Sequence, residues 1–318
     1  MELGSLLRWS LPPNFKNGFT DCYNASIYTT VFNYAMKYPN LFGCHFGFHY
    51  EPKDGHRKLE DRFRAGGLSD NCDDMLCRIT GLSTIEQETK SVEGLLEKAR
   101  SQVRKGHPVT IKVYAYDCPW NIAYLQTHFE HYLCFLGEDG KGDLWGHDAF
   151  CGINRVKLPS LERLHISKQY LTYRYSPDDI LVQEPFSILE EAMRYYIREK
   201  CASAIFSFTQ ELLDSRTLYE ELKDSGVLCI NAFFIKLKGI VSNRLNFQYF
   251  LMETSLSGIS HLLSSFQAAC ACWYEAYRIL NKYMIRNGNL TCLTAACKKM
   301  DEAALIEEHC ATHFLQTK

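Results

Sequence analysis

The chain has 318 residues, with 35 Lys and Arg against 37 Asp and Glu, giving a formal net charge of −2. This balance argues against a nucleic-acid-binding protein, which usually presents a basic face. Hydrophobic residues at 46% and charged residues at 23% are ordinary for a globular protein and argue against general disorder. The 14 cysteines are many, yet they fall short of the roughly 8–10% found in disulfide-rich secreted scaffolds.

The first 13 residues contain no apolar run of the signal-peptide kind. The longest uncharged stretch, Thr254–Tyr274, contains six Ser or Thr residues and has apolar residues at helical spacing. This pattern indicates a pair of amphipathic helices rather than a membrane span. We therefore expect a cytoplasmic protein with no membrane partner, whose cysteines are free thiols in a reducing compartment.

In chain order, the first half predicts an α+β arrangement. The predicted elements are a helix over 22–38, a strand over 43–51, a mostly irregular stretch over 51–74, a helix over 91–105, and strands over 108–116, 131–137 and 144–150. Thr20 or Asp21 can cap the first helix. The turn EDGKGD joins the last two strands and makes them antiparallel neighbours.

A connector containing proline, around residues 176–187, separates this half from a nearly all-helical remainder. Helices are predicted there over 187–200, 203–223, 226–240, 243–257, 259–287 and 300–314. The sequence thus predicts a catalytic domain over 1–183 and a mostly helical C-terminal domain over 184–318, which would act as a lid or platform.

Three residues fall where a nucleophilic site needs them. Cys22 opens the first helix, where the helix dipole favours a thiolate. His131 opens a strand and could exchange a proton with that thiol. Asp148 closes the neighbouring strand and could orient the imidazole. The order Cys, His and then a carboxylate predicts a cysteine-dependent catalytic triad.

Metal binding is the competing use of the cysteines. The sequence contains no CxxC pair, and tetrahedral zinc sites need four convergent ligands. Cys44, His45 and His49 lie close together, but the alternation in CHFGFHYEP is that of a strand with one apolar face. We therefore expect no metal site.

Residues 20–33 (TDCYNASIYTTVFN) look like the nucleophile helix of papain-like enzymes. Residues 112–150 resemble the N-terminal domain of the butirosin-biosynthesis (BtrH-like) acyltransferase family. The matching positions are Asp117, Pro119, Tyr124, His128, His131, Gly137 and Asp148. Residues 41–51 and the helical tail are also similar to that family, so the resemblance covers most of the chain and implies a papain-like fold.

The resemblance implies acyl transfer from the phosphopantetheine thioester of a carrier protein onto an amine, in natural-product assembly. Cys22 would be acylated, His131 would act as base and acid, and Asp148 would orient it. No cofactor is implied beyond the carrier's phosphopantetheine. Among family members, such a cysteine-rich chain most resembles the amide-forming transferases of closthioamide-type polythioamide assembly, which use a small diamine.

Further site residues are expected around this triad. Papain-like enzymes usually carry a Gln before the Cys as an oxyanion donor. None precedes Cys22 here, so Asn14 or Asn17 could supply the side-chain donor, alongside the Cys22 backbone N–H. Asn17 is preferred, although it suits a turn before Gly18 equally well. Asp117, Trp120 and Tyr124 are expected to line the substrate site, although Asp117 could equally be structural.

Four nearby polar residues are expected to take no part in catalysis. His128 is expected in a loop, His147 on the opposite sheet face, and Glu130 and Asp139 in solvent.

Two other functions remain open from the sequence. The same triad would serve a cysteine hydrolase, either a peptidase or a thioesterase. A papain-like scaffold could also be a binding protein in which Cys22 is no more reactive than the other thiols.

Overall fold

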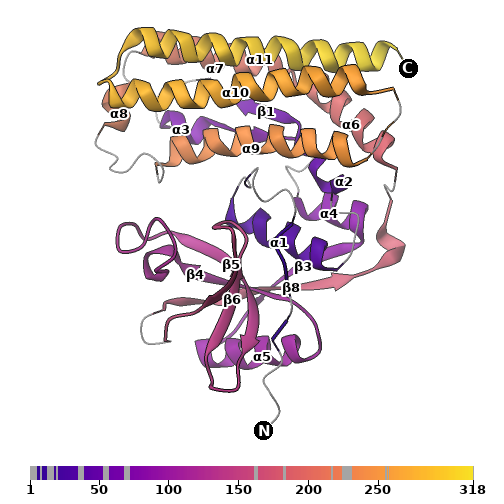
Figure 1. Cartoon of the computed structure of the whole chain (residues 1–318), viewed down its shortest axis with the longest axis vertical. Helices are drawn as coiled ribbons and strands as arrows, with labels where there is room; N and C mark the ends of the chain where they lie inside the picture. Colours follow the sequence, from indigo (N-terminus) through magenta and orange to yellow (C-terminus); the bar gives the residue numbers. More distant parts are fainter. Residues whose placement is uncertain are drawn as a thin grey trace. The chain divides into compact units, whose positions relative to one another are not determined.

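The computed structural model describes all residues except 1–5, 8, 13–17, 19–20, 35–38, 53–56, 68–71, 161–163, 182–183, 216–217, 224–230, 255, 257 and 318. Its helices and antiparallel sheets confirm the α+β class. The chain forms two compact units, which Figure 1 shows coloured along the sequence. The first unit comprises Met1–Tyr38 and Leu76–Leu181, and the second comprises Pro39–Met75 and Val182–Lys318. Residues 39–75, assigned from the sequence to the first domain, thus belong with the helical second unit.

The first unit is built on a six-stranded antiparallel sheet. Its spatial order is β3 (Leu82–Glu88), β8 (Ile166–Tyr175), β4 (Val109–Tyr114), β5 (Glu130–Glu138), β6 (Leu144–Asp148) and β7 (Ile153–Lys157). Its helices are α1 (Cys22–Asn33), α5 (Val92–Arg104) and the end of α4 (Cys72–Thr80). The central strands β4, β5 and β6 were predicted. The strands β3, β7 and β8 were missed, and β7 is largely exposed and lacks an apolar face.

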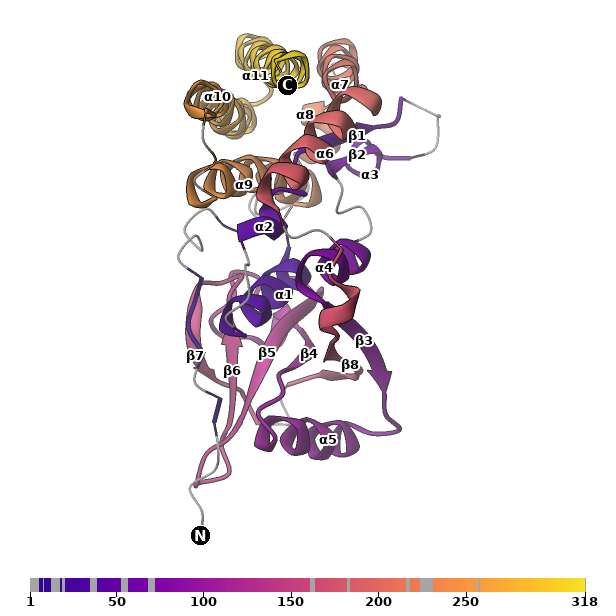
Figure 2. The same ribbon diagram turned by 90° about the vertical axis from the view of Figure 1, so that its right-hand side faces the viewer.

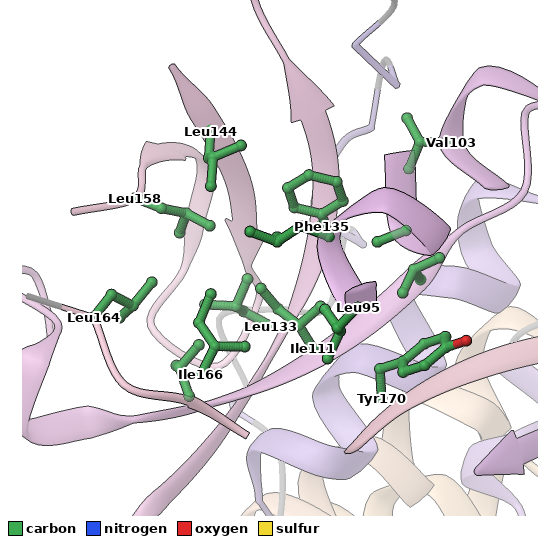
Figure 3. Packing of buried hydrophobic residues seen from close by; sticks show 14 of the residues in the cluster. Leu95, Val103, Ile111, Leu133, Phe135, Leu144, Leu158, Leu164, Ile166 and Tyr170 are labelled. Carbon is green, nitrogen blue, oxygen red and sulfur yellow. The ribbon is translucent and has the colours of Figure 1, made fainter. Parts of the chain in front are cut away.

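Helix α5 covers one face of the sheet. Ser91 caps it by accepting a 3.1 Å hydrogen bond from the Gly94 N–H. Its apolar residues Leu95, Leu96, Ala99 and Val103 recur at helical spacing and are all buried. They pack with Ile111, Leu133 and Phe135 of the central strands (Figure 3). Burying each leucine contributes about 1.5–3 kcal/mol, so this cluster is a main source of the unit's stability.

Helix α1 packs on the opposite side of β5 (Figure 2). The ring of Tyr23 contacts that of Tyr132 edge-on at 5.3 Å. The Cys134 thiol lies 3.7 Å from the Ser26 carbonyl oxygen. Tyr132 and Cys134 alternate along β5 with the residues that face α5, as strand geometry requires. Helix α1 therefore has its start fixed next to the start of β5.

The β5–β6 hairpin is closed by Asp139. Its Oδ1 accepts N–H groups of Lys141 and Asp143 at 2.9 and 3.0 Å, and its Oδ2 accepts the Trp145 Nε1–H at 3.0 Å. Asp139 is therefore a turn-forming residue rather than a merely solvated one. A Cβ on Gly146 would lie 2.8 Å from a Leu133 methyl group, so a larger residue here would require the Leu133 side chain to shift.

The second unit combines a small hairpin with helices. Its elements are α2 (Pro39–Phe42), β1 (Gly47–Tyr50), α3 (Leu59–Arg62), β2 (Phe63–Gly66), α6 (Pro185–Arg198), α7 (Cys201–Ser215), α8 (Leu218–Leu222), α9 (Ala232–Glu253), α10 (Ser260–Ile285) and α11 (Leu290–Gln316). The helices predicted over 226–240 and 243–257 are a single helix, α9, capped by Asn231. Helix α10 spans much of the uncharged stretch. None of the helices in the described part of the chain is both long and apolar enough to cross a membrane.

A buried ion pair and its hydrogen bonds join four elements of the second unit. Arg244 of α9 and Glu307 of α11 are both 0% exposed and form two parallel hydrogen bonds of 3.0 Å. The Trp273 Nε1–H donates to the same carboxylate at 2.9 Å. Arg244 also donates to the Gly47 carbonyl oxygen of β1 at 2.5 Å. The pair thus ties the hairpin to the helices that follow it much later in the sequence.

Candidate active site

The Cys22 thiol lies at the first residue of α1. Asp21 is in extended conformation before it, and its Oδ1 accepts the Asn24 N–H at 2.7 Å. This is an N-cap, and it starts the helix at Cys22. The Cys22 Sγ is half-buried and lies 4.0 Å from the carbonyl oxygen of Glu130, the residue before His131. The start of α1 and the start of β5 therefore meet at this thiol.

His131 and Asp148 form a closed pair beside it. His131 Nε2 lies 2.7 Å from Asp148 Oδ2, and both side chains are 0% exposed. The hairpin supplies this proximity, because β5 and β6 are antiparallel neighbours. The structure brings the predicted His and Asp into hydrogen-bonding contact.

Two further residues hold Asp148. The Trp120 Nε1–H donates to Asp148 Oδ2 at 2.8 Å. The Cys151 backbone N–H donates to Oδ1 at 3.0 Å. Both carboxylate oxygens therefore accept hydrogen bonds, as a buried carboxylate requires. Trp120, which we expected to line the substrate site, contacts the Asp148 carboxylate instead.

The pKa values describe a charged pair. Burial alone would lower the pKa of His131, but the Asp148 hydrogen bond opposes burial. The thiols of Cys151 and Cys22 add to this effect, so the pKa of His131 stands well above its ordinary value. Burial would raise the pKa of Asp148, and the bonds from His131, Cys151 and Trp120 hold it below its ordinary value. These shifts favour a protonated His131 beside an ionised Asp148.

The other ring nitrogen of His131 faces a different environment. Its Nδ1 is buried and makes no hydrogen bond with any residue that the structure describes. The thiols of Cys22 and Cys151 nevertheless lie close enough to affect the pKa of the ring. A buried imidazolium N–H needs an acceptor, and a neighbouring thiolate can serve as one.

Cys151 is the site residue that the sequence analysis missed. It follows Asp148 by three residues in the turn after β6, and its thiol accepts a hydrogen bond from Asn121 Nδ2 at 3.6 Å. Burial raises the pKa of Cys151 above its ordinary value, although the nearby His131 ring opposes this effect. Nearby Cys118 is fully buried, and burial raises its pKa to about 12. The spacing D-x-x-C was the only local signal for Cys151.

The remaining expected site residues are placed as follows. Asp117 Oδ2 accepts the His165 backbone N–H at 3.1 Å and contacts His165 Nδ1 at 2.8 Å, which is a loop-supporting role. Tyr124 is 38% exposed, and its backbone N–H donates to the Asn121 carbonyl. Asn17, the expected oxyanion donor, lies outside the described residues.

Three polar residues near the site, His128, His147 and Glu130, make the following contacts. The His128 ring stacks on Tyr116 at 3.9 Å in the loop before β5. His147 is fully buried and lies 2.8 Å, through Nδ1, from the Asn154 carbonyl oxygen. Glu130 is largely exposed but forms an ion pair with Lys112 at 3.1 Å.

His45 and His49, the histidines of the disfavoured zinc motif, lie in the second unit. His45 is buried, and burial lowers its pKa to about 4. His49 Nε2 lies 2.5 Å from the Tyr195 hydroxyl. Within the described part of the chain, the only three candidate metal ligands whose atoms lie within 4.8 Å of one another are His131, Asp148 and Cys151.

No protein-family model matches this chain, and no curated protein matches it either.

Proposed function

We propose that this chain is a cysteine-dependent acyltransferase with a papain-like catalytic domain and a helical C-terminal domain, related to the butirosin-biosynthesis acyltransferases. The observation that carries the proposal is the buried His131–Asp148 pair, 2.7 Å apart, at the point where Cys22 opens α1. A thiol, an imidazole and an orienting carboxylate are the parts that acyl-enzyme chemistry needs.

The first half-reaction acylates Cys22. Its thiolate attacks the carbonyl carbon of a thioester carried on the phosphopantetheine of a carrier protein, and a tetrahedral oxyanion forms. The Cys22 backbone N–H, at the positive end of α1, is the proposed donor to that oxyanion, together with Asn17. The oxyanion collapses, the carbon–sulfur bond to the carrier breaks, and the imidazolium of His131 gives its proton to the departing thiolate.

The second half-reaction forms the amide. His131, now neutral, accepts a proton from the incoming amine as the amine attacks the acyl-Cys22 carbonyl. Collapse of this intermediate expels the Cys22 thiolate and leaves the proton on His131, so the starting state is restored. Throughout, Asp148 supports the imidazolium, and Trp120 keeps Asp148 in place. A small diamine is the proposed acceptor, and the protein needs no cofactor of its own.

The proposal also implies a compartment. Cys22 must remain a free thiolate, so the protein is proposed to act in the reducing cytoplasm. All twelve cysteines that the structure describes as free thiols, Cys22 among them, fit this requirement.

The test is detection of the acyl-enzyme by intact mass. The full chain is mixed with an acyl-loaded carrier protein, or with a short acyl-pantetheine thioester, and the adduct is located by peptide mass. We expect acylation at Cys22, loss of the adduct in Cys22→Ala, and retention in Cys77→Ala, which removes another half-buried thiol. An adduct that persists in Cys22→Ala would refute the proposal.

The same experiment separates transfer from hydrolysis, which uses the same residues. The isolated acyl-enzyme is offered a small diamine in water, and the amide and free-acid products are quantified. We expect amide to dominate. Free acid with every amine offered would make the chain a hydrolase. Iodoacetamide labelling addresses the third possibility, because a binding protein would show Cys22 labelled no faster than Cys77.

A further inference from the structure

We propose that His261, His309 and His313 form a binding site for Zn²⁺ on the surface of the second unit. His309 and His313 lie four residues apart on α11, and this spacing puts both side chains on one face of the helix. The His261 ring, near the start of α10, lies edge-on to the His313 ring with the centroids 5.3 Å apart. The His309 and His313 rings are stacked at 6.0 Å. His313 therefore contacts both of the other rings.

The spacing of the rings suits a single ion. Zinc holds imidazole nitrogens at about 2.0–2.1 Å, so two rings that share a tetrahedral ion have their centroids about 5 Å apart. The observed centroid distances of 5.3 and 6.0 Å are close to this value. The three nitrogens do not yet all lie within 4.8 Å of one another, so the rings must turn about their Cβ–Cγ bonds. That torsion is broad for histidine, and all three side chains are exposed, so the rings have room to turn.

The three residues offer nitrogen ligands only, which selects the metal class. Cys310 lies between two of them in the sequence, but it is buried, and burial raises the pKa of its thiol to about 11. The Glu307 carboxylate is also buried and is held by Arg244 and Trp273. Imidazole nitrogens suit zinc and its neighbours copper and nickel, whereas magnesium and calcium prefer oxygen ligands. Solvent would take the fourth position of a tetrahedral zinc ion.

The bound ion would tie together the ends of two helices. Helices α10 and α11 pack side by side, and the short turn between Ile285 and Leu290 joins them at one end (Figure 1). His261 is the second residue of α10, and His313 lies three residues before the end of α11, so the site lies at the opposite, unjoined end. Helix ends are the first parts of a fold to open. Zinc should therefore slow the opening of the last turn of α11, because it links that turn to the start of α10.

The binding test uses the full reduced chain, stripped of metal, and a chromophoric chelator that competes for Zn²⁺. Half-buried thiols can also take up zinc, so the site is assigned from the difference between the unaltered chain and its variants. His313→Ala and His261→Ala should each weaken one equivalent of zinc at least about tenfold, since even partners outside the coordination sphere are worth 10–100-fold. The matched control is His107→Ala, which removes an exposed histidine of the first unit and should leave zinc affinity unchanged.

Two measurements on the unaltered chain locate the ion without relying on a variant. Bound Zn²⁺ should slow the modification of His309 and His313 by diethyl pyrocarbonate, located by peptide mass, while His107 keeps its rate. Zinc should also slow hydrogen exchange in the last turn of α11. In His313→Ala, the exchange rate of that turn should no longer respond to zinc.

The site is overturned if the unaltered chain and His313→Ala bind zinc equally well, or if zinc leaves the modification of His309 and His313 unchanged. It is also overturned if His261→Ala alone binds zinc as the unaltered chain does, because the ion would then bind α11 without linking it to α10. None of these results depends on an acyl-enzyme at Cys22. The zinc site and the proposed function are therefore tested separately.

Discussion

The indole of Trp120 and the carboxylate of Asp148 are joined by a 2.8 Å hydrogen bond. The accepting oxygen, Oδ2, is also the one that contacts His131 at 2.7 Å. One carboxylate oxygen therefore receives two donors, one from a loop and one from β5. The loop residue fixes the carboxylate, and the carboxylate fixes the imidazole.

Replacing Trp120 by Phe tests this chain of contacts. The variant keeps an aromatic side chain but loses the donor, and a hydrogen bond to a charged group is worth about 1.5–3 kcal/mol. We expect the rate of Cys22 acylation to fall on the order of tenfold. The control is Trp145→Phe, which also removes one indole donor, to Asp139 in the β5–β6 turn. An equal loss of rate in both variants would contradict the specific role of Trp120.

Asp21 has two opposing effects on its neighbour Cys22. Its side chain caps α1 through the Asn24 N–H, but its negative charge disfavours a thiolate at the next residue. Asn caps as well as Asp, so Asp21→Asn removes the charge and keeps the cap. We expect iodoacetamide labelling of Cys22 at neutral pH to accelerate, on the order of threefold, from weaker charge repulsion.

The matched variant Asp21→Ala separates the two effects. It removes both the charge and the cap, so it should also destabilise the first unit by about 1 kcal/mol. Denaturant unfolding measures that cost. If Asp21→Asn slowed the labelling of Cys22, the carboxylate would not act through its charge.

The buried pair of Arg244 and Glu307 predicts a large stability effect. Glu307→Gln keeps the shape of the side chain but leaves the Arg244 charge uncompensated at 0% exposure. Breaking a buried pair from one side costs about 3–5 kcal/mol. The control is Glu275→Gln, which breaks a surface pair with Arg278 and should cost less than about 1 kcal/mol. If both variants lost the same free energy of unfolding in urea, the buried pair would contribute no more to stability than the surface pair.

His45 makes the stability of the second unit depend on pH. Its pKa is about 4 in the folded chain because burial disfavours the charged ring, against about 6.5 when unfolded. Between these values the unfolded chain binds more protons, so stability is lost as pH falls from about 6.5 toward 4. The loss from this residue is at most about 3 kcal/mol. We expect His45→Gln to make the free energy of unfolding less dependent on pH over this range. If the pH dependence is unchanged, a group other than His45 causes it.

The helix start at Cys22 and the pairing of His131 with Asp148 could be predicted from local signals. Asp21 and the apolar pattern after it place Cys22 at a helix start, and the turn EDGKGD makes the strands of His131 and Asp148 antiparallel neighbours. Each step uses contacts that are short in sequence. The hydrogen-bonded His131–Asp148 pair follows from them directly.

What could not be predicted depends on contacts that are distant in sequence or made by irregular segments. The Trp120 indole reaches Asp148 from a loop, whose path no periodic pattern specifies. The edge strand β7 has exposed residues on both faces, so it lacks the alternation that identifies a strand. Residues 39–75 join the second unit through partners such as Arg244, nearly two hundred residues later.

This last arrangement affects the order in which the protein can fold during synthesis. The β1–β2 hairpin leaves the ribosome early, with Phe48 and Phe63 on it, but their partner Phe208 lies in α7. More than a hundred residues, including most of the first unit, are translated in between. The nascent chain must hold these aromatic side chains without their partners until α7 has been translated. A fragment that stops at residue 181 would keep that exposure permanently, so aggregation on expression follows for the truncated chain and not for the full one.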